Sequence, residues 1–178
     1  MTFVIAFAGK IGSGKTTIST AISKVLGCKR ASFGDYVRQV ASRRGLECTR
    51  EILQYVGTEA LETDKLEFCK NVLEYSGWSQ GEPLVIDGLR HSETIPLLNQ
   101  LVSPAQLRIV YMDIDEQSRF ERLGIHGEVQ MEVLTLADAH SSEQEAATIL
   151  HNIADVIVDG RKPIENCVAA VLEWMAKS

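Results

Sequence analysis

One short segment near the start of the chain has the residue types and the spacing that hold a polyphosphate. Gly9-Lys10-Ile11-Gly12-Ser13-Gly14-Lys15-Thr16 matches the pattern G-x-x-x-x-G-K-S/T at every fixed position. Glycines let such a loop curl until its N–H groups converge on phosphate oxygens, and the following helix adds the positive end of its dipole. Lys15 suits the β- and γ-phosphates, and the Thr16 hydroxyl suits Mg²⁺. The residues predicted to contact the nucleotide here are Gly9, Gly12, Ser13, Gly14, Lys15, Thr16 and Thr17.

The hydrophobic pattern predicts the elements that must position this loop. Residues 3–8 form a continuous apolar run, typical of a strand buried on both faces, and an amphipathic helix pattern follows the loop as far as Gly27. Further strands are expected at 29–33, 83–87, 107–112 and 155–158. Further helices are expected at 35–44, 50–61, 63–76, 92–101, 115–123, 141–151 and 163–176.

This order of elements predicts a single α/β domain over residues 1–178. Strands that alternate with helices form a parallel sheet covered on both faces, here a three-layer sandwich around five strands. The helices within about 35–76 stand between two strands as an insertion. Residues 124–138 show no clear period, so we expect a mobile loop there.

Composition narrows the classes of partner. A net charge of −6 over 178 residues argues against binding to a nucleic-acid polymer, because such proteins neutralise phosphates with surplus Lys and Arg. No run approaches the roughly 20 apolar residues of a membrane span. The four cysteines are scattered without metal-ligand spacing, which indicates free thiols and a cytoplasmic location.

Four segments in order, spread over nearly the whole chain, resemble those of nucleoside monophosphate kinases, and adenylate kinases in particular. The first is Gly9–Thr16. Phe33–Arg38 resembles the family's G-D-x-x-R, and Ile86–Arg90 resembles D-G-F-P-R with one residue missing. Asp159–Pro163 is similar to a D-G-x-x-P stretch near adenine, which implies nucleotide contacts from Gly160 and Lys162. The resemblance implies a P-loop NTPase fold, ATP as phosphoryl donor, and residues 35–76 as an acceptor-binding insertion.

The same likeness assigns roles to charged residues beyond the loop. Asp87 ends a buried apolar strand, where a carboxylate requires compensation that Mg²⁺ would supply. The alternative is a capping or turn aspartate before Gly88. Arg90 follows at the carboxyl end of that strand and is expected on the acceptor phosphate, with a solvated arginine as the alternative. Asp35 and Arg38 share one helix face. They form either an intrahelical ion pair or part of the acceptor site.

A second stretch of the insertion is similar to phage deoxynucleoside monophosphate kinases. Thr49 has the position of a helix N-cap, and Arg50 and Gln54 lie one turn apart, so they could reach a base or a phosphate. A solvated helix face explains the last two equally well.

The region expected to close over the donor departs from the family. The family's lid arginines spread the charge of the transferring phosphoryl group. Arg119 and Arg122 are the candidates here, and Arg122 matches the first lid arginine and is a predicted catalytic residue with Lys15 and Arg90. His126 stands where a second arginine is usual, and the stretch 123–151 contains no Arg or Lys. The histidines there have no metal-site spacing.

The sequence thus predicts an ATP-dependent phosphotransferase for a small phosphorylated acceptor, a nucleoside or deoxynucleoside monophosphate. Two alternatives stay open. Residues 152–158 are similar to dephospho-CoA kinase, whose acceptor is a hydroxyl, and Asp35 would then be a candidate base. A slow nucleotide-hydrolysing switch is the other alternative, although no N/T-K-x-D guanine signature is present. The identity of the acceptor and the oligomeric state do not follow from these motifs.

Overall fold

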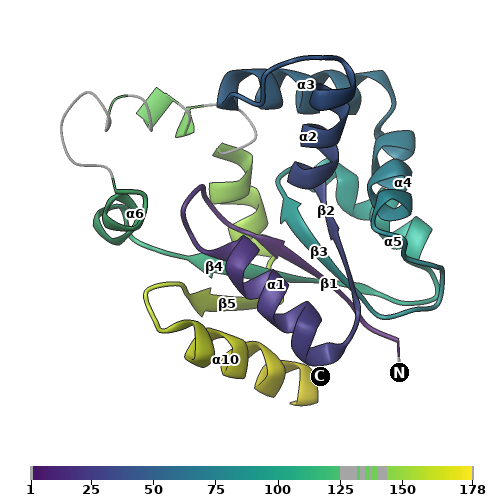
Figure 1. Cartoon of the computed structure of the whole chain (residues 1–178). Coiled ribbons are helices and arrows are strands. Elements are labelled where there is room, and N and C mark those ends of the chain that lie inside the picture. The colour runs from purple at the N-terminus through teal and green to yellow at the C-terminus, as the bar shows by residue number, and fades with distance from the viewer. Residues whose placement is uncertain (1, 125–131, 133–134, 137, 140–143, 178) are drawn as a thin grey trace.

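The protein is described by a computed structural model that covers residues 2–124, 132, 135–136, 138–139 and 144–177. Figure 1 shows one central sheet with helices packed against both of its faces. The strands are β1 (Val4–Ala8), β2 (Lys29–Ser32), β3 (Leu84–Leu89), β4 (Leu107–Asp113) and β5 (Val156–Asp159). All are parallel, in the order β2-β3-β1-β4-β5. The expected three-layer α/β sandwich with a five-stranded parallel sheet is therefore confirmed.

More helices cover one face of the sheet than the other. α1 (Lys15–Leu26) and α10 (Ile164–Lys177) pack together on one face (Figure 1). The other face carries the helices that follow β2 and β3, and the helical stretch that precedes β5. These are α2 (Phe33–Arg43), α3 (Arg50–Thr63), α4 (Lys65–Tyr75), the 3₁₀ turn η1 (Ser92–Thr94), α5 (Ile95–Val102), the π-helical η2 (Ala146–Leu150) and α9 (His151–Ile153). α6 (Glu116–Arg122) follows β4.

The central strand β1 divides the core into two clusters. Val4, Ala6 and Ala8 pack toward α2–α5, whereas Ile5 and Phe7 pack toward α1 and α10. All five residues are at most 1% exposed. A strand buried on both faces reads as an unbroken apolar run, which is why residues 3–8 could be identified as the middle of the sheet.

Short polar side chains fix the start of several helices. Ser32 accepts a hydrogen bond from the Asp35 N–H and begins α2 two residues earlier than expected. Thr49 accepts one from the Ile52 N–H, which confirms it as the N-cap of α3. Asp64 caps α4, and Asp115 caps α6, in the same way. Each such cap stabilises its helix by about 1 kcal/mol.

Two expected elements need correction. The helix expected over 92–101 is a 3₁₀ turn followed by α5, because Pro96 lies at the start of α5, where its missing N–H is tolerated. Most of the loop expected at 124–138, and the start of the helix expected at 141–151, lie outside the described residues. The described positions 132, 135, 136 and 138 are helical, as is the chain from 144 to 153.

The described residues bear on two expectations from composition. None of their helices is both long enough and apolar enough to cross a membrane. All four cysteines are free thiols, as their scatter predicts.

Candidate active site

The loop Gly9–Thr16 connects β1 to α1, and three of its glycines have positive φ. Gly9 has a φ of 145°, and a Cβ atom there would lie 2.7 Å from the carbonyl oxygen of Met112. Gly12 has a φ of 80°, and a Cβ atom there would lie 2.9 Å from the Leu123 side chain. Residues with a side chain rarely adopt such φ values. The curl of the loop therefore requires glycine at both positions.

Lys15 is the charged group at the centre of this loop. Its side chain is buried, and its ammonium donates a hydrogen bond to the carbonyl oxygen of Lys10 at 3.1 Å. Burial lowers the pKa of Lys15 to about 7, and the nearby positive charge of Arg90 adds to the shift, while Asp87 opposes it. A lysine held this way gains its full charge when an anion is bound beside it.

A cavity of about 750 Å³ lies against the loop and is called the P-loop cavity here. It brings together most of the residues predicted to bind the nucleotide, including Gly160 and Lys162 from the turn after β5. Gly9 instead packs beneath the loop against Met112. The lining residues are Gly12, Ser13, Gly14, Lys15, Thr16, Thr17, Ile18, Met112, Arg122, Leu123, Gly160, Arg161, Lys162, Pro163, Ile164 and Cys167.

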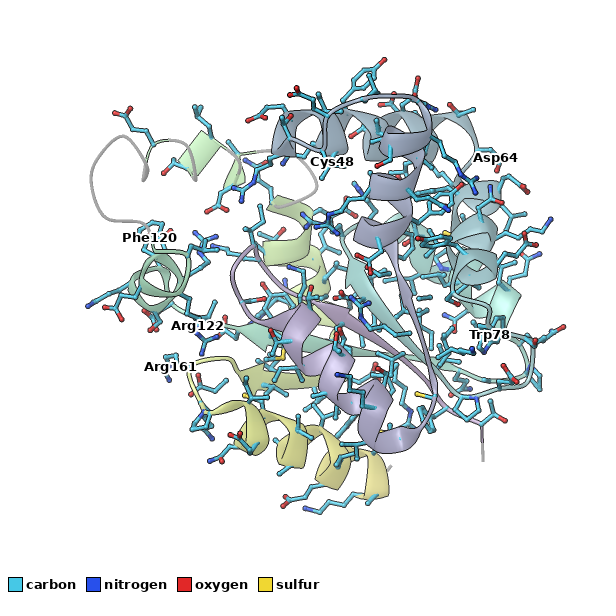
Figure 2. The ribbon with its side chains drawn as sticks, in the orientation of Figure 1. Cys48, Asp64, Trp78, Phe120, Arg122 and Arg161 are labelled. Atoms are coloured by element: carbon cyan, nitrogen blue, oxygen red, sulfur yellow. The ribbon has the colours of Figure 1, made fainter. Side chains whose placement is uncertain are left out.

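A second cavity, of about 380 Å³, lies on the other side of the loop and is called the α2–α3 cavity. Ile11 of the loop forms part of its wall, so the loop separates the two cavities. Three arginines and several apolar side chains share its lining. Cys48, which lies beside α3 (Figure 2), also lines it. Its other lining residues are Phe33, Gly34, Val37, Arg38, Arg50, Leu53, Gln54, Gly57, Thr58, Phe68, Gly88, Arg90, His91 and Thr94.

Two of the arginines of the α2–α3 cavity, Arg38 and Arg50, act on the third, Arg90. Burial lowers the pKa of Arg90, Asp87 opposes that shift, and the charges of Arg50 and Arg38 lower it further. No carboxylate belongs to the described lining of this cavity. The cavity therefore has a positive field that suits an anion, with apolar walls that suit a ring.

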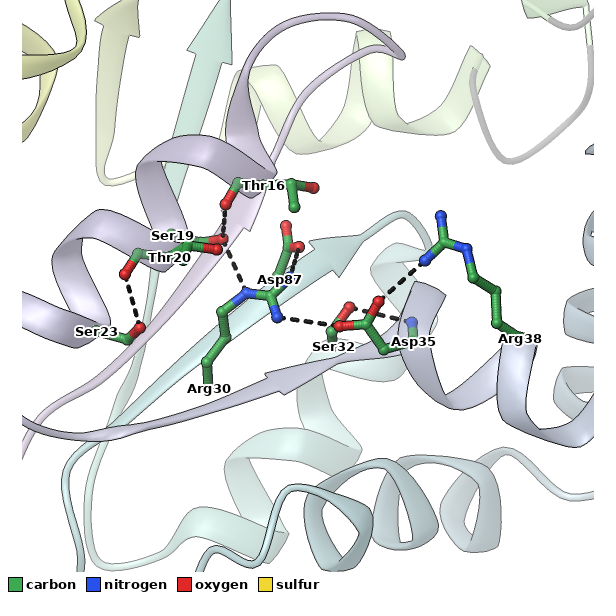
Figure 3. Close-up of polar contacts among 9 residues, drawn as sticks. All are labelled: Thr16, Ser19, Thr20, Ser23, Arg30, Ser32, Asp35, Arg38 and Asp87. Atoms are coloured by element: carbon green, nitrogen blue, oxygen red, sulfur yellow. Dashed lines mark hydrogen bonds and ion pairs between the residues drawn. The ribbon is translucent and has the colours of Figure 1, made fainter.

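Arg30 connects the carboxylates at the floor of the site. Its guanidinium donates to Asp87 Oδ2 at 2.8 Å, to Asp35 Oδ2 at 3.0 Å and to Ser19 Oγ at 3.3 Å. Asp35 Oδ1 in turn accepts from Arg38 at 3.0 Å. Figure 3 shows this chain of contacts, with the Asp87 carboxylate directed toward Thr16.

A bulge in β3 orients the residues at the end of that strand. Phe7 pairs with Asp87, but Ala8 pairs with Leu89, so Gly88 is the extra residue, with a φ of 85°. Asp87 faces α1, and the bulge turns Leu89 toward the α2–α5 side, where it joins that cluster. Arg90 can then line the α2–α3 cavity. The segment Asp87–Arg90 is one residue shorter than the D-G-F-P-R pattern. Asp87 still faces α1, and Arg90 still lines the α2–α3 cavity.

Arg30 is a residue of the site that the sequence motifs did not indicate. A buried carboxylate requires compensation. We expected Mg²⁺ to supply it for Asp87, whereas the compensation within the described chain is an ion pair with Arg30. The signal available in the sequence was a basic residue inside a short strand that ends at the same edge of the sheet as β3. Its partner follows only from the pairing of β2 with β3, in which Ser32 lies opposite Asp87.

The structure separates the two lid candidates. Arg119 is 1% exposed and is held by Asp138 at 2.8 Å, and a Cβ atom on Gly12 would lie 3.0 Å from its Cγ. Arg119 therefore packs against the loop and does not line the P-loop cavity. Arg122 is exposed and lines the P-loop cavity, on the same side of the molecule as Arg161 (Figure 2). His126 lies outside the described residues.

The helical stretch before β5 is attached to the end of β3. Glu145 accepts a hydrogen bond from the Ser92 N–H at 2.6 Å, and its other oxygen lies 3.4 Å from His91 Nδ1. Burial lowers the pKa of His91, and Glu145 opposes that shift. Within the described residues, no three His, Cys, Asp or Glu side chains group as a metal site.

Comparisons with known proteins give the fold and the relatives of the chain. The model of the AAA domain family matches residues 5–151. A UPF0200 protein of Pyrobaculum aerophilum is 30% identical over 91% of this chain and 90% of its own length. A cytidylate kinase of Thermoplasma volcanium is 33% identical over 42% of this chain and 44% of its own.

A solved structure extends the likeness to the fold. Shikimate kinase of Aquifex aeolicus has a TM-score of 0.61, covering 98% of this chain and 96% of its own. At 21% identity this match establishes the P-loop kinase-like fold and leaves the acceptor open.

Proposed function

Because the chain belongs to the AAA domain family and to the UPF0200 proteins, and has a P-loop kinase-like fold, we propose that it transfers the γ-phosphoryl group of ATP to a small phosphorylated acceptor, namely a nucleoside or deoxynucleoside monophosphate. The observation that carries the proposal is the pair of cavities with the phosphate-binding loop as their common wall. A donor in one cavity and an acceptor in the other would meet at Lys15. A switch that only hydrolyses its nucleotide needs no second cavity.

The lining of the α2–α3 cavity supports a phosphorylated acceptor. Arg38, Arg50 and Arg90 offer planar forks that bind phosphate through paired hydrogen bonds. Phe33 and Phe68, whose ring centroids are 5.4 Å apart, give this cavity an apolar wall of the kind that covers a base. The likeness to a cytidylate kinase over part of the chain points to the same acceptor class.

The contacts of Asp35 weigh against a hydroxyl acceptor. Such an acceptor needs a base to take its proton, and Asp35 is the candidate. Its two oxygens each accept from a guanidinium at 3.0 Å, one from Arg30 and one from Arg38. A phosphate acceptor is already ionised at neutral pH, so it needs no base and leaves these ion pairs intact.

Mg²⁺ is the cofactor that we propose to accompany ATP, held by Thr16 and Asp87. The fit rests on Asp87 Oδ1, a buried oxygen without a hydrogen-bond partner in the described chain. Hard cations such as Mg²⁺ are bound by oxygen ligands of this kind, often through water. When bound, the ion would neutralise charge on the β- and γ-phosphates.

The protein's own groups would supply the rest of catalysis by position and charge. Lys15 would contact the β- and γ-phosphates, and Arg90 with Arg38 would hold the acceptor phosphate in line with them. Arg122 would approach the transferring group from the P-loop cavity, so it is the proposed lid arginine. Gly160 and Lys162 would border the adenine.

The test is an acceptor panel with purified protein and Mg-ATP. Each common nucleoside monophosphate, its deoxy form, dephospho-CoA, shikimate, gluconate and a blank are scored for both ADP and phosphorylated product. We expect product from one or a few monophosphates. Lys15→Met protein, prepared in parallel, controls for contaminating kinases because it lacks the phosphate-binding ammonium.

Two results would contradict the proposal. Transfer to dephospho-CoA, shikimate or gluconate alone would identify a hydroxyl kinase. ADP formed equally with and without any acceptor would identify a nucleotide-hydrolysing switch.

A further inference from the structure

We propose that Arg30 is a positioning residue that couples the two cavities, holding Asp87 on the donor side and Asp35 on the acceptor side with one guanidinium. The inference rests on the proposed function for the identity of the two ligands. Nothing in the motifs assigns Arg30 a role, because it belongs to none of them.

Arg30 sets the orientation of Asp87 through a hydrogen bond from its Nη2, and we call this contact the donor arm. Arg30 Nη2 occupies Asp87 Oδ2 at 2.8 Å, and this leaves Oδ1 buried, unpartnered in the described chain and directed toward Thr16 (Figure 3). The Asp87 side chain is 4% exposed, so solvent does not compete for it. Without Arg30 the carboxylate would be free to rotate. Its Oδ1 would then no longer be held toward the cation and the phosphates.

Arg30 sets the orientation of Arg38 through Asp35, and we call this path the acceptor arm. Arg30 Nη1 holds Asp35 Oδ2, and Asp35 Oδ1 holds Arg38, each at 3.0 Å. The Arg38 side chain is 56% exposed, so it has few other restraints on the wall of the α2–α3 cavity. Fixing a long side chain in advance lowers the entropy lost when it binds a phosphate. Arg30 thereby prepares an acceptor contact that it does not itself make.

The third contact ties both arms to the helix that follows the phosphate-binding loop. Arg30 Nε donates to Ser19 Oγ, whose hydroxyl donates to the Thr16 carbonyl oxygen at 3.0 Å. Arg30 thus joins α1, α2 and β3 from its place on β2. A guanidinium can serve three acceptors in one plane, whereas a lysine ammonium cannot span the same carboxylates.

The experiment measures two ratios for wild type, Arg30→Met and Arg30→Lys by calorimetry. The first is the affinity for a non-hydrolysable ATP analogue with Mg²⁺ over that without it. The second is the affinity for the accepted monophosphate over that for its nucleoside. We expect Arg30→Met to lower each ratio about tenfold, the effect of losing a partner behind a ligand. Arg30→Lys should restore at most one of the two ratios.

Matched variants separate coupling from general damage. Arg44→Met removes an exposed arginine that pairs with Glu59 and lines neither cavity, so both ratios should stay at the wild-type value. Asp35→Asn cuts the acceptor arm alone, so only the monophosphate ratio should fall. Combining Asp35→Asn with Arg30→Met should lower that ratio no further than Arg30→Met does, because both changes break one path.

The outcomes distinguish this inference from the proposed function. Arg30→Met protein with a lower melting temperature but both ratios unchanged would reduce Arg30 to a structural ion pair and overturn the inference. The inference is likewise overturned if Asp35→Asn leaves the monophosphate ratio at the wild-type value, a result that can be read even should Arg30→Met fail to fold. Wild-type protein that transfers to no acceptor would instead contradict the proposed function, while the Mg²⁺ ratio still tests the donor arm.

Discussion

Lys15 is buried, and burial sets its response to pH. Its folded-state pKa is lowered from 10.5 to about 7, chiefly by burial. Between these values the unfolded chain binds the extra proton, so the contribution of Lys15 to folding stability rises with pH over that window. A polyphosphate beside the amine favours the charged form and reverses the shift.

We therefore predict that nucleotide binding at about pH 8 takes up close to one proton through Lys15. Calorimetry of an ATP analogue in two buffers of different ionisation enthalpy measures that number. Lys15→Arg is the matched control, because its guanidinium stays charged throughout and should lose the uptake. An equal proton count in the two proteins would show that Lys15 is already charged before the ligand arrives.

At the residue scale, the sequence predicts the groups that follow from local pattern and misses those that depend on strand pairing. Lys15 and Thr16 line their cavity because the loop motif fixes their surroundings. The two interpretations of Asp35 and Arg38 turn out to be compatible, since the pair forms an ion pair and Arg38 also lines the α2–α3 cavity. Arg30 could not be assigned, because it lies 57 residues from Asp87 along the chain.

At the scale of elements, the turn after β5 is packed directly against the phosphate-binding loop. A Cβ atom on Gly160 would lie 2.9 Å from the carbonyl oxygens of both Asp113 and Ser13. These are backbone atoms at the end of β4 and within the loop, so the clash cannot be relieved by a side-chain rotation. A methyl group there must move either the loop or the turn.

We predict that Gly160→Ala weakens binding of the ATP analogue by about tenfold or more and lowers the melting temperature, since overpacking costs about 1–3 kcal/mol. Calorimetry and thermal unfolding measure the two effects. Gly57→Ala is the control: its Cβ atom would meet only Val37, at 3.7 Å, within α3, so analogue affinity should be unchanged. Wild-type affinity in Gly160→Ala would mean that the turn yields without disturbing the loop.

Element boundaries follow from local chemistry where that chemistry is strong. The five strands begin and end within two residues of expectation, and the reason is clearest for β1, whose unbroken apolar run leads directly into the glycine-rich loop. α2 and η1 differ from expectation for reasons of single residues, namely the Ser32 cap and Pro96. The bulge at Gly88 was not predicted, since a one-residue register shift becomes visible only when β1 and β3 are aligned.

At the scale of the whole molecule, the proposed transfer requires two ligands to bind on either side of one loop, and the two cavities provide that arrangement. The phosphate-binding loop contributes Ile11 to one cavity and Gly12 to the other. In the proposed complex the acceptor phosphate lies next to the γ-phosphate, so a single phosphate chain would connect the two ligands. Joining two binding events in one molecule raises the effective concentration of the second.

We predict that a bisubstrate compound, ATP joined through its phosphates to the acceptor nucleoside, raises the melting temperature more than the ATP analogue and free acceptor do together at equal concentration. The increase follows from tighter binding to the folded state alone. Thermal unfolding in the presence of each ligand measures it. A shift no larger than that of the ATP analogue would show that the α2–α3 cavity does not take the acceptor.

The three-layer plan was predictable because alternation of strands and helices allows few arrangements. The cavities that this plan creates were less predictable from the sequence. That α2 and α3 would form a separate cavity with three arginines depends on how Arg38, Arg50 and Arg90 converge from two helices and a strand end, and no local pattern contains that.

The separation of the two cavities by the loop also has a consequence for the evolution of the protein. Among the described residues, none lines both cavities, and the α2–α3 cavity is formed from residues 33–68 and 88–94 together with Ile11. If the α2–α3 cavity binds the acceptor as proposed, mutations in those stretches would alter the preferred acceptor without changing the walls of the P-loop cavity. Under the proposed function, the acceptor could then change in evolution or by engineering while the phosphoryl donor stays the same.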